Sequence, residues 1–166
     1  MAITRQGEMP RGDQGNGVSF DRRTDDGTVV AKVLAPAPAV WEALVSAMAD
    51  RKVRPTLVDR PAGRIGDTSM VLMRRWNESP LSTYLSCGTS MTGQRANDER
   101  IRAVFLAQIS RQKADTVAIV VHFSGVSTPV ASGNGGSSGQ CTSTGKAEEE
   151  LLRDVVRRVG GSPRNR

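Results

Sequence analysis

Cys87 and Cys141 are the only cysteines, and they are the side chains whose type and spacing say most about chemistry. Two thiols can ligate a metal, act as a redox pair, stay free in a core or form a disulfide. The chain has no CxxC motif and one histidine, so it lacks a zinc ligand set and a thioredoxin-like pair. Both cysteines stand in polar junctions rich in Gly, Ser and Thr, where a buried free thiol would be out of place. The pattern favours a disulfide and an oxidising compartment.

No other residues form a convincing catalytic set. His122 falls within an alternating apolar stretch, where it could act as a base or a ligand, but a half-exposed sheet position also accounts for it. The adjacent acids Asp98 and Glu99 have no helical frame that would make their carboxylates converge. The glycine-rich residues 133–139 are not followed by the Gly-Lys-Ser/Thr of a phosphate-binding loop. We therefore predict no catalytic residue, no metal site and no cofactor.

The tripeptide Arg74-Arg75-Trp76 is the strongest candidate for recognition. Two guanidinium groups beside an aromatic ring can hold an anion or an acidic partner. Alternation along a strand would place Arg74 and Trp76 on one face and Arg75 on the other. This split counts against a joint site, so the three residues stand only as a candidate contact for an anion or an acidic partner.

The formal net charge of +6 also allows an anionic partner such as nucleic acid or a lipid surface. The basic residues are spread along the chain without a dense basic block, which makes nucleic-acid binding unlikely as the main function. No apolar run approaches the roughly 20 residues of a membrane span. The first ten residues also lack the apolar core of a signal peptide, so an exported protein would have lost its signal segment.

Composition predicts one domain with polar ends. Only 37% of the residues are apolar, and the 17 glycines and 8 prolines point to long loops or tails. Residues 1–26 are polar and are expected to form a disordered lead or tether. Residues 27–160 would form a single domain, and residues 161–166 would form a disordered tail.

Hydrophobic periodicity predicts the elements of that domain. Strand patterns alternate with a period of two, and helical patterns repeat at three and four residues. Residues 39–51 and 145–159 show helical spacing. The predicted strands are residues 28–34, 54–59, 64–76 with a bulge near Gly66-Asp67, 99–110 and 116–124, the last two forming a hairpin. The order β-α-β-β-β-β-α predicts an α+β fold in which an antiparallel sheet of about five strands packs on a long C-terminal helix.

Two segments resemble known families. Residues 35–44, with the sequence APAPAVWEAL, resemble the first strand-to-helix junction of START-like domains. Residues 80–88 (PLSTYLSCG), the alternating hairpin and residues 141–145 (CTSTG) resemble bacterial envelope proteins with a helix-grip domain. That domain is similar to the helix-grip modules of the lipoprotein accessory subunit of outer-membrane barrel assembly. The resemblance covers about residues 27–160.

The envelope resemblance implies an exported or lipid-anchored protein whose partner is an envelope protein or surface. We therefore expect a non-enzymatic binding or scaffolding domain. The START-like resemblance implies an alternative, a carrier of a small apolar ligand between the sheet and the last helix. A further alternative is a weak nucleic-acid or anionic-surface binder. The carrier would need an apolar pocket, for which the expected lining is Trp41, Phe105, Phe123 and Leu152.

Overall fold

The computed structural model describes residues 19–23, 28–130 and 138–160. The tail predicted at residues 161–166, most of the lead predicted at residues 1–26 and the centre of the glycine-rich loop lie outside these ranges. The described part is an α+β fold with an antiparallel sheet, a C-terminal helix and one disulfide, which confirms the predicted fold class.

Four long antiparallel strands form the centre of the sheet. They are β2 (Thr28–Leu34), β11 (Thr116–Thr128), β10 (Arg100–Lys113) and β4 (Arg64–Met73), in that spatial order. Shorter strands extend the sheet: β1 (Ser19–Arg23) beside β2, β3 (Leu57–Asp59) and β5 (Arg75–Trp76) beside β4, β6 (Ser79–Pro80) beside β5, β12 (Gly139–Ser143) beside β11, and β7 (Leu85–Ser86) beside β12. A separate hairpin consists of β8 (Thr89–Ser90) and β9 (Gly93–Gln94).

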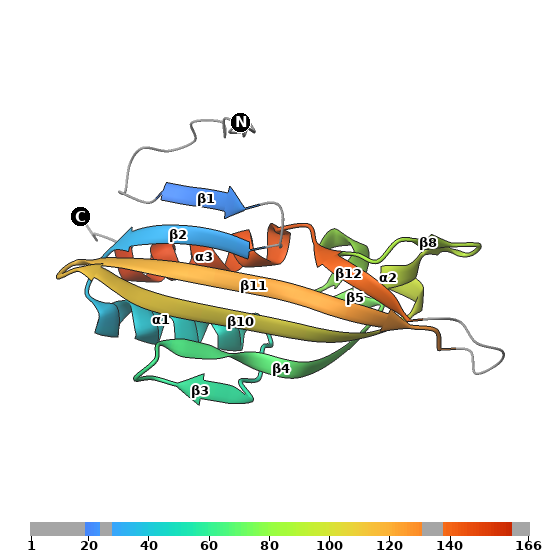
Figure 1. Ribbon diagram of the computed structural model, residues 1–166, viewed down its shortest axis with the longest axis horizontal. Coiled ribbons are helices and arrows are strands. Elements are labelled where there is room, and N and C mark those ends of the chain that lie inside the picture. Colours follow the sequence, from blue (N-terminus) through green and yellow to red (C-terminus); the bar gives the residue numbers. More distant parts are fainter. Residues whose placement is uncertain (1–18, 24–27, 131–137, 161–166) are drawn as a thin grey trace, which may run out of the picture.

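Two long helices cover one face of the sheet, and no described helix covers the other, which we call the open face (Figure 1). They are α1 (Ala37–Asp50) and α3 (Lys146–Gly160), which also pack on each other. A short helix, α2 (Arg95–Asp98), and a 3-10 turn, η1 (Leu81–Thr83), lie near the end of the sheet that carries β7.

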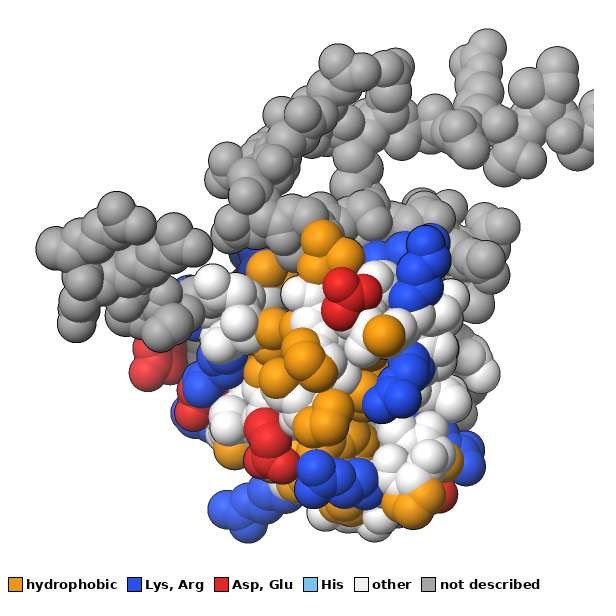
Figure 2. All heavy atoms as spheres, turned by 90° about the vertical axis from the view of Figure 1, so that its left-hand side faces the viewer, with side chains coloured by type: hydrophobic (Ala, Val, Ile, Leu, Met, Phe, Trp, Pro, Cys, Tyr) orange, Lys and Arg blue, Asp and Glu red, His pale blue; other side chains and the backbone are white. Residues whose placement is uncertain are grey.

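The core lies between the helices and the inner face of the hairpin that β10 and β11 form. Alternation places one set of hairpin residues on this face: Ile101, Ala103, Phe105, Ala107, Val117, Ile119, Val121 and Phe123. At one end of the molecule a band of hydrophobic side chains reaches the surface, flanked by charged side chains of both signs (Figure 2). Half-buried residues of the helices, including Val45, Val156 and Val159, pack against the core.

The structure has more strands than the sequence predicted. β1 lies within residues 1–26, which were expected to be disordered, and it pairs in register with β2. The predicted strand 64–76 is broken at Arg74, and the bulge predicted near Gly66-Asp67 lies between Asp67 and Met70. β5 and β6 form a short hairpin next to β4, and β7 pairs with the distant β12; strands of two to five residues leave little periodic signal.

Cys87 and Cys141 form the predicted disulfide, and both are buried. Cys87 follows β7, and Cys141 lies within β12, where it is paired with Gly125 of β11. The bond therefore joins the segment leading into the β8–β9 hairpin to the strand that leads into α3. The sequence separation is 54 residues, so the cross-link closes a long loop in the unfolded chain.

Removing the bond with Cys87→Ala and Cys141→Ala together should lower the free energy of unfolding by about 4 kcal/mol, from the entropy of a loop of this length. Urea denaturation followed by circular dichroism measures the loss. Dithiothreitol should destabilise the native protein by a similar amount and leave the double variant unchanged. Equal stability of the oxidised protein and the double variant would show that the cross-link contributes nothing.

Candidate anion-binding pocket

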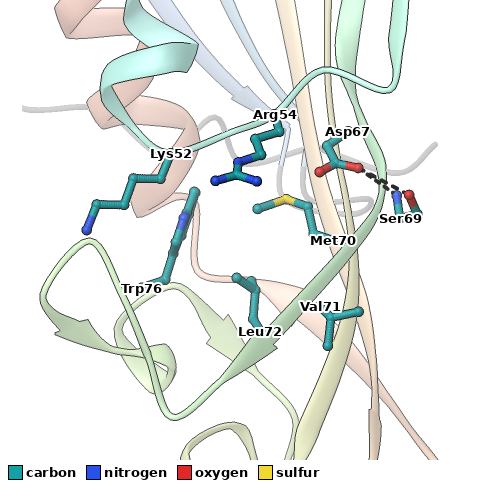
Figure 3. A pocket seen from close by; sticks show the side chains of 8 residues that line it. All are labelled: Lys52, Arg54, Asp67, Ser69, Met70, Val71, Leu72 and Trp76. Atoms are coloured by element: carbon teal, nitrogen blue, oxygen red, sulfur yellow. Dashed lines mark hydrogen bonds between the residues drawn. The ribbon is translucent and has the colours of Figure 1, made fainter.

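A pocket of about 330 Å³ opens beside β4, where the segment after α1 approaches β5 (Figure 3). Its volume lies at the lower end of the range for small-ligand sites. Lys52 and Arg54 come from the segment after α1, Trp76 comes from β5, and the remaining lining residues belong to β4. These are Asp67, Ser69, Met70, Val71 and Leu72.

Lys52 reaches the pocket because of the way α1 ends. The amide of Lys52 donates to the carbonyl of Ala49, and the amide of Val53 donates to the carbonyl of Met48. This is a Schellman ending, which needs a left-handed residue at its first position beyond the helix. Lys52 takes that position with φ 59°, where glycine is the usual residue, and Val53 is buried behind it. The chain then leaves the helix with Arg54 over the same space (Figure 3).

Trp76 forms the inner wall of the pocket and also belongs to the core. Its ring centroid lies 5.1 Å from that of Tyr84, 5.8 Å from Phe105 and 5.4 Å from Phe123. The side chain is 6% exposed, and its indole Nε1 is buried without a hydrogen-bond partner in the described part of the chain. A buried N–H donor without an acceptor costs about 1–3 kcal/mol, so Trp76 carries an unsatisfied donor at the wall of the pocket.

Two turns hold Trp76 in place. Arg74 has φ 64° and reverses the chain between β4 and β5. Asn77 and Glu78, with φ 49° and 66°, form the two-residue turn between β5 and β6. Both central residues of such a hairpin turn must be left-handed, a conformation that suits Asn but not Glu.

A set of polar contacts holds the segment that carries Lys52 and Arg54. We call it the Arg51 clasp; its members are Arg51, Tyr84, Asn77 and Glu150. Arg51 is ion-paired with Glu150 of α3, and Tyr84 donates its hydroxyl to the same carboxylate at 3.4 Å. The Nδ2 of Asn77 donates to the carbonyl of Arg51 at 3.0 Å. The clasp thus joins the end of α1, the start of α3 and the β5–β6 turn. Lys52 is the next residue after Arg51, so the clasp also fixes the backbone position of Lys52.

Backbone strain is concentrated around this pocket. Within residues 19–23, 28–130 and 138–160, the non-glycine residues with positive φ are Lys52, Arg74, Asn77 and Glu78. One lines the pocket, and three stand in the turns on either side of Trp76. Such conformations cost about 1–3 kcal/mol each and cluster at functional sites. All four lie in the helix ending and the two turns that form the walls of the pocket.

The pocket presents mostly hydrogen-bond donors. Lys52 and Arg54 are exposed and have no ion-pair partner among the described residues. Asp67 is the acid of the pocket, and its Oδ1 accepts from the amide of Ser69 at 2.9 Å and the hydroxyl of Thr56 at 3.3 Å. Two cations and one carboxylate leave one excess positive charge. Two cations, an unsatisfied indole N–H and an apolar wall suit an anionic group with an apolar part.

The structure divides the residues that the sequence grouped as an anion site. Trp76 lines the pocket, whereas Arg74 and Arg75 are exposed and do not line it. Arg75 instead donates through Nη2 to the carbonyl of Glu78 across the turn. The sequence did not single out Lys52 and Arg54. Both are visible in the basic segment after the first predicted helix, but no local pattern indicates that this segment meets Trp76.

The residues expected to line an apolar carrier pocket are all buried. Trp41, Phe105, Phe123 and Leu152 are 0–5% exposed and belong to one packed cluster. Phe105 and Phe123 contact each other edge to face at 5.2 Å. None of the four lines the pocket beside β4. His122 is half-buried on the open face of the sheet, opposite Leu106 and Thr28.

No protein-family model matches the chain, and a search of curated proteins finds no significant relative. Over the described ranges, no helix is long and apolar enough to cross a membrane. The same part of the chain contains no cluster of three or more His, Cys, Asp or Glu side chains that could hold a metal ion. The pocket therefore has to be interpreted from its own geometry.

The strain at Lys52 gives a direct test of the backbone argument. Lys52→Gly should raise the free energy of unfolding by about 0.5–1 kcal/mol, because glycine adopts the left-handed conformation without steric cost. Lys32→Gly is the matched control: Lys32 is an exposed strand residue, and glycine there should destabilise by a similar amount. Chemical denaturation measures both. A less stable Lys52→Gly protein would contradict the proposed strain.

Proposed function

We propose that this protein is a non-enzymatic, exported binding domain that holds the anionic group of a small ligand, or of a partner's side chain or terminus, in the pocket of Lys52, Arg54 and Trp76. The observation that carries this proposal is the unpartnered, buried indole N–H of Trp76 beside two cations that lack ion pairs among the described residues. These groups all donate hydrogen bonds or carry positive charge, so they favour an acceptor such as a carboxylate.

The apolar wall supports an amphipathic ligand rather than a bare anion. Met70, Leu72 and the ring of Trp76 are buried at the inner side of the pocket. An anion with a small aromatic or branched apolar part could place its charge against Lys52 and Arg54 and its apolar part against this wall. The small volume fits one such group and not a large lipid.

Binding without catalysis is favoured because the pocket lacks a matched nucleophile and base. Ser69 donates to Asp67 at 3.4 Å, but the lining residues include no histidine or cysteine. A serine beside a carboxylate, which is a weak base, and without a histidine is poorly activated. The carrier alternative is not adopted, because the four residues expected to line its cavity are packed in the core.

The disulfide supports the location that we propose. A buried Cys87–Cys141 bond is compatible with export to an oxidising compartment, where such bonds persist. Envelope association follows from the same proposal, with the partner recognised through its anionic group.

Calorimetric titration with benzoate tests the pocket, with benzyl alcohol as the uncharged counterpart. Benzoate should bind measurably and benzyl alcohol much more weakly, because the cations recognise the charge. Lys52→Gln combined with Arg54→Gln should lower benzoate affinity by at least about tenfold, from the loss of charge-assisted hydrogen bonds.

Arg111→Gln with Lys113→Gln is the matched control, since these exposed residues lie at the far end of β10 and remove the same charge. Its affinity for benzoate should be unchanged. If both double variants lost the same affinity for benzoate, the effect would come from net charge and not from the pocket. Equal binding of benzyl alcohol and benzoate would contradict an anion site.

A further inference from the structure

A second surface, which shares only Val71 with the pocket, lies on the open face where β10 begins and β4 and β11 end. The strand register places Val71, Arg102 and Val126 side by side in one row across β4, β10 and β11. Paired residues of antiparallel strands project from the same face, and Arg102 points away from the core because its neighbour Ile101 is fully buried. Two residues further along, a second row holds Met73 and Arg100. The rows are about 7 Å apart.

This surface combines exposed apolar side chains with unpaired cations. Val71 is 60% exposed, Met73 41% and Val126 37%. Arg100 and Arg102 are exposed, and neither has an ion pair with any other described residue. No acid stands in either row. The opposite end differs, since acids stand among the cations there (Figure 2).

The β8–β9 hairpin projects from the same end of the molecule (Figure 1). Met91 at its tip is fully exposed. Thr92 donates its hydroxyl to Asp98 at 3.2 Å and shares a hydrogen bond of 3.0 Å with Ser90, so the tip is held in shape. Val130, 50% exposed, follows the end of β11.

The Cys87–Cys141 bond holds both the base of the β8–β9 hairpin and the end of β11 in place. Cys87 directly precedes β8, and Cys141 lies in β12, which pairs with the end of β11. The disulfide therefore ties the base of the hairpin to the strands that carry Val126. The exposed apolar side chains therefore project from segments that the disulfide cross-links to the sheet.

We propose that this basic-apolar end, made of Val71, Met73, Met91, Arg100, Arg102, Val126 and Val130, docks on the surface of an anionic lipid bilayer. Arginines attract anionic headgroups, and separate apolar side chains can each enter the boundary between headgroups and acyl chains. A protein partner would require one contiguous complementary patch, whereas these side chains are divided between a sheet face and a projecting hairpin. The nearby acids are engaged: Asp98 by Thr92, and Glu99, which is buried, by Arg95 at 2.9 Å.

Vesicle co-sedimentation of the oxidised full chain tests the electrostatic part. The protein should sediment with vesicles of phosphatidylcholine containing about 30% phosphatidylglycerol and much less with phosphatidylcholine alone. Arg100→Gln with Arg102→Gln should weaken the partitioning by roughly 10- to 30-fold. Arg111→Gln with Lys113→Gln, at the other end of the same hairpin, should leave it within about twofold, because those side chains face away from the bilayer.

Tryptophan fluorescence tests the apolar part. Both native tryptophans are buried, so the emission of Met91→Trp reports an exposed indole at the hairpin tip. Its emission should move to shorter wavelength on anionic vesicles and be quenched by brominated lipid. Leu34→Trp, at an equally apolar and 61% exposed position at the other end of the sheet, should not respond.

Several outcomes would overturn the proposal. These are no binding to anionic vesicles, equal losses in the two double variants, or equal responses of the Met91→Trp and Leu34→Trp proteins. Retention of the protein on polyglutamate without vesicle binding would assign the surface to an acidic protein partner and likewise overturn it. None of these results depends on benzoate binding, so the surface and the pocket can fail separately.

Discussion

The packing of Trp76 against Tyr84, Phe105 and Phe123 is the interaction on which the site depends. Trp76 lies in a strand of two residues, and it reaches the core because the chain reverses on both sides of it. Burial of a tryptophan removes about 150–250 Å² from water, which corresponds to roughly 4–6 kcal/mol. The three left-handed residues beside it cost about 1–3 kcal/mol each. The free energy gained by burying Trp76 is therefore comparable to the cost of the strained turns and can offset it.

One strand, β4, contributes side chains both to the pocket and to the exposed face of the sheet. Leu72 of β4 is buried at the pocket, while Val71 and Met73 are exposed at the basic-apolar end. Strand alternation thus lets β4 contribute Leu72 to the inner side of the pocket and Val71 and Met73 to the exposed face of the sheet. The disulfide and the Arg51 clasp act at different ends of this arrangement: the bond braces the hairpin base, and the clasp holds the segment that carries the pocket's cations.

Local patterns made much of the fold predictable from the sequence. The hairpin and the last helix were predicted because strand alternation and helical spacing are visible in neighbouring residues. The disulfide was predicted because both cysteines stand in polar junctions. Pairings such as β7 with β12 were not predictable, because two-residue strands exist only through distant partners. Of the residues that line the pocket, only Trp76 was predicted from the sequence to be a contact residue. Lys52 meets it through a left-handed helix ending that usually carries glycine, so its side-chain direction could not be inferred.

The indole N–H signal of Trp76 in a nitrogen-15 spectrum is the most direct test of the central claim. In the free protein this proton should resonate as a non-hydrogen-bonded indole, because Nε1 has no partner among the described residues. Saturating benzoate should move it downfield, while the signal of Trp41, which is buried away from the pocket, stays in place. A Trp76 signal that does not respond to benzoate, or that moves no more than that of Trp41, would contradict the account.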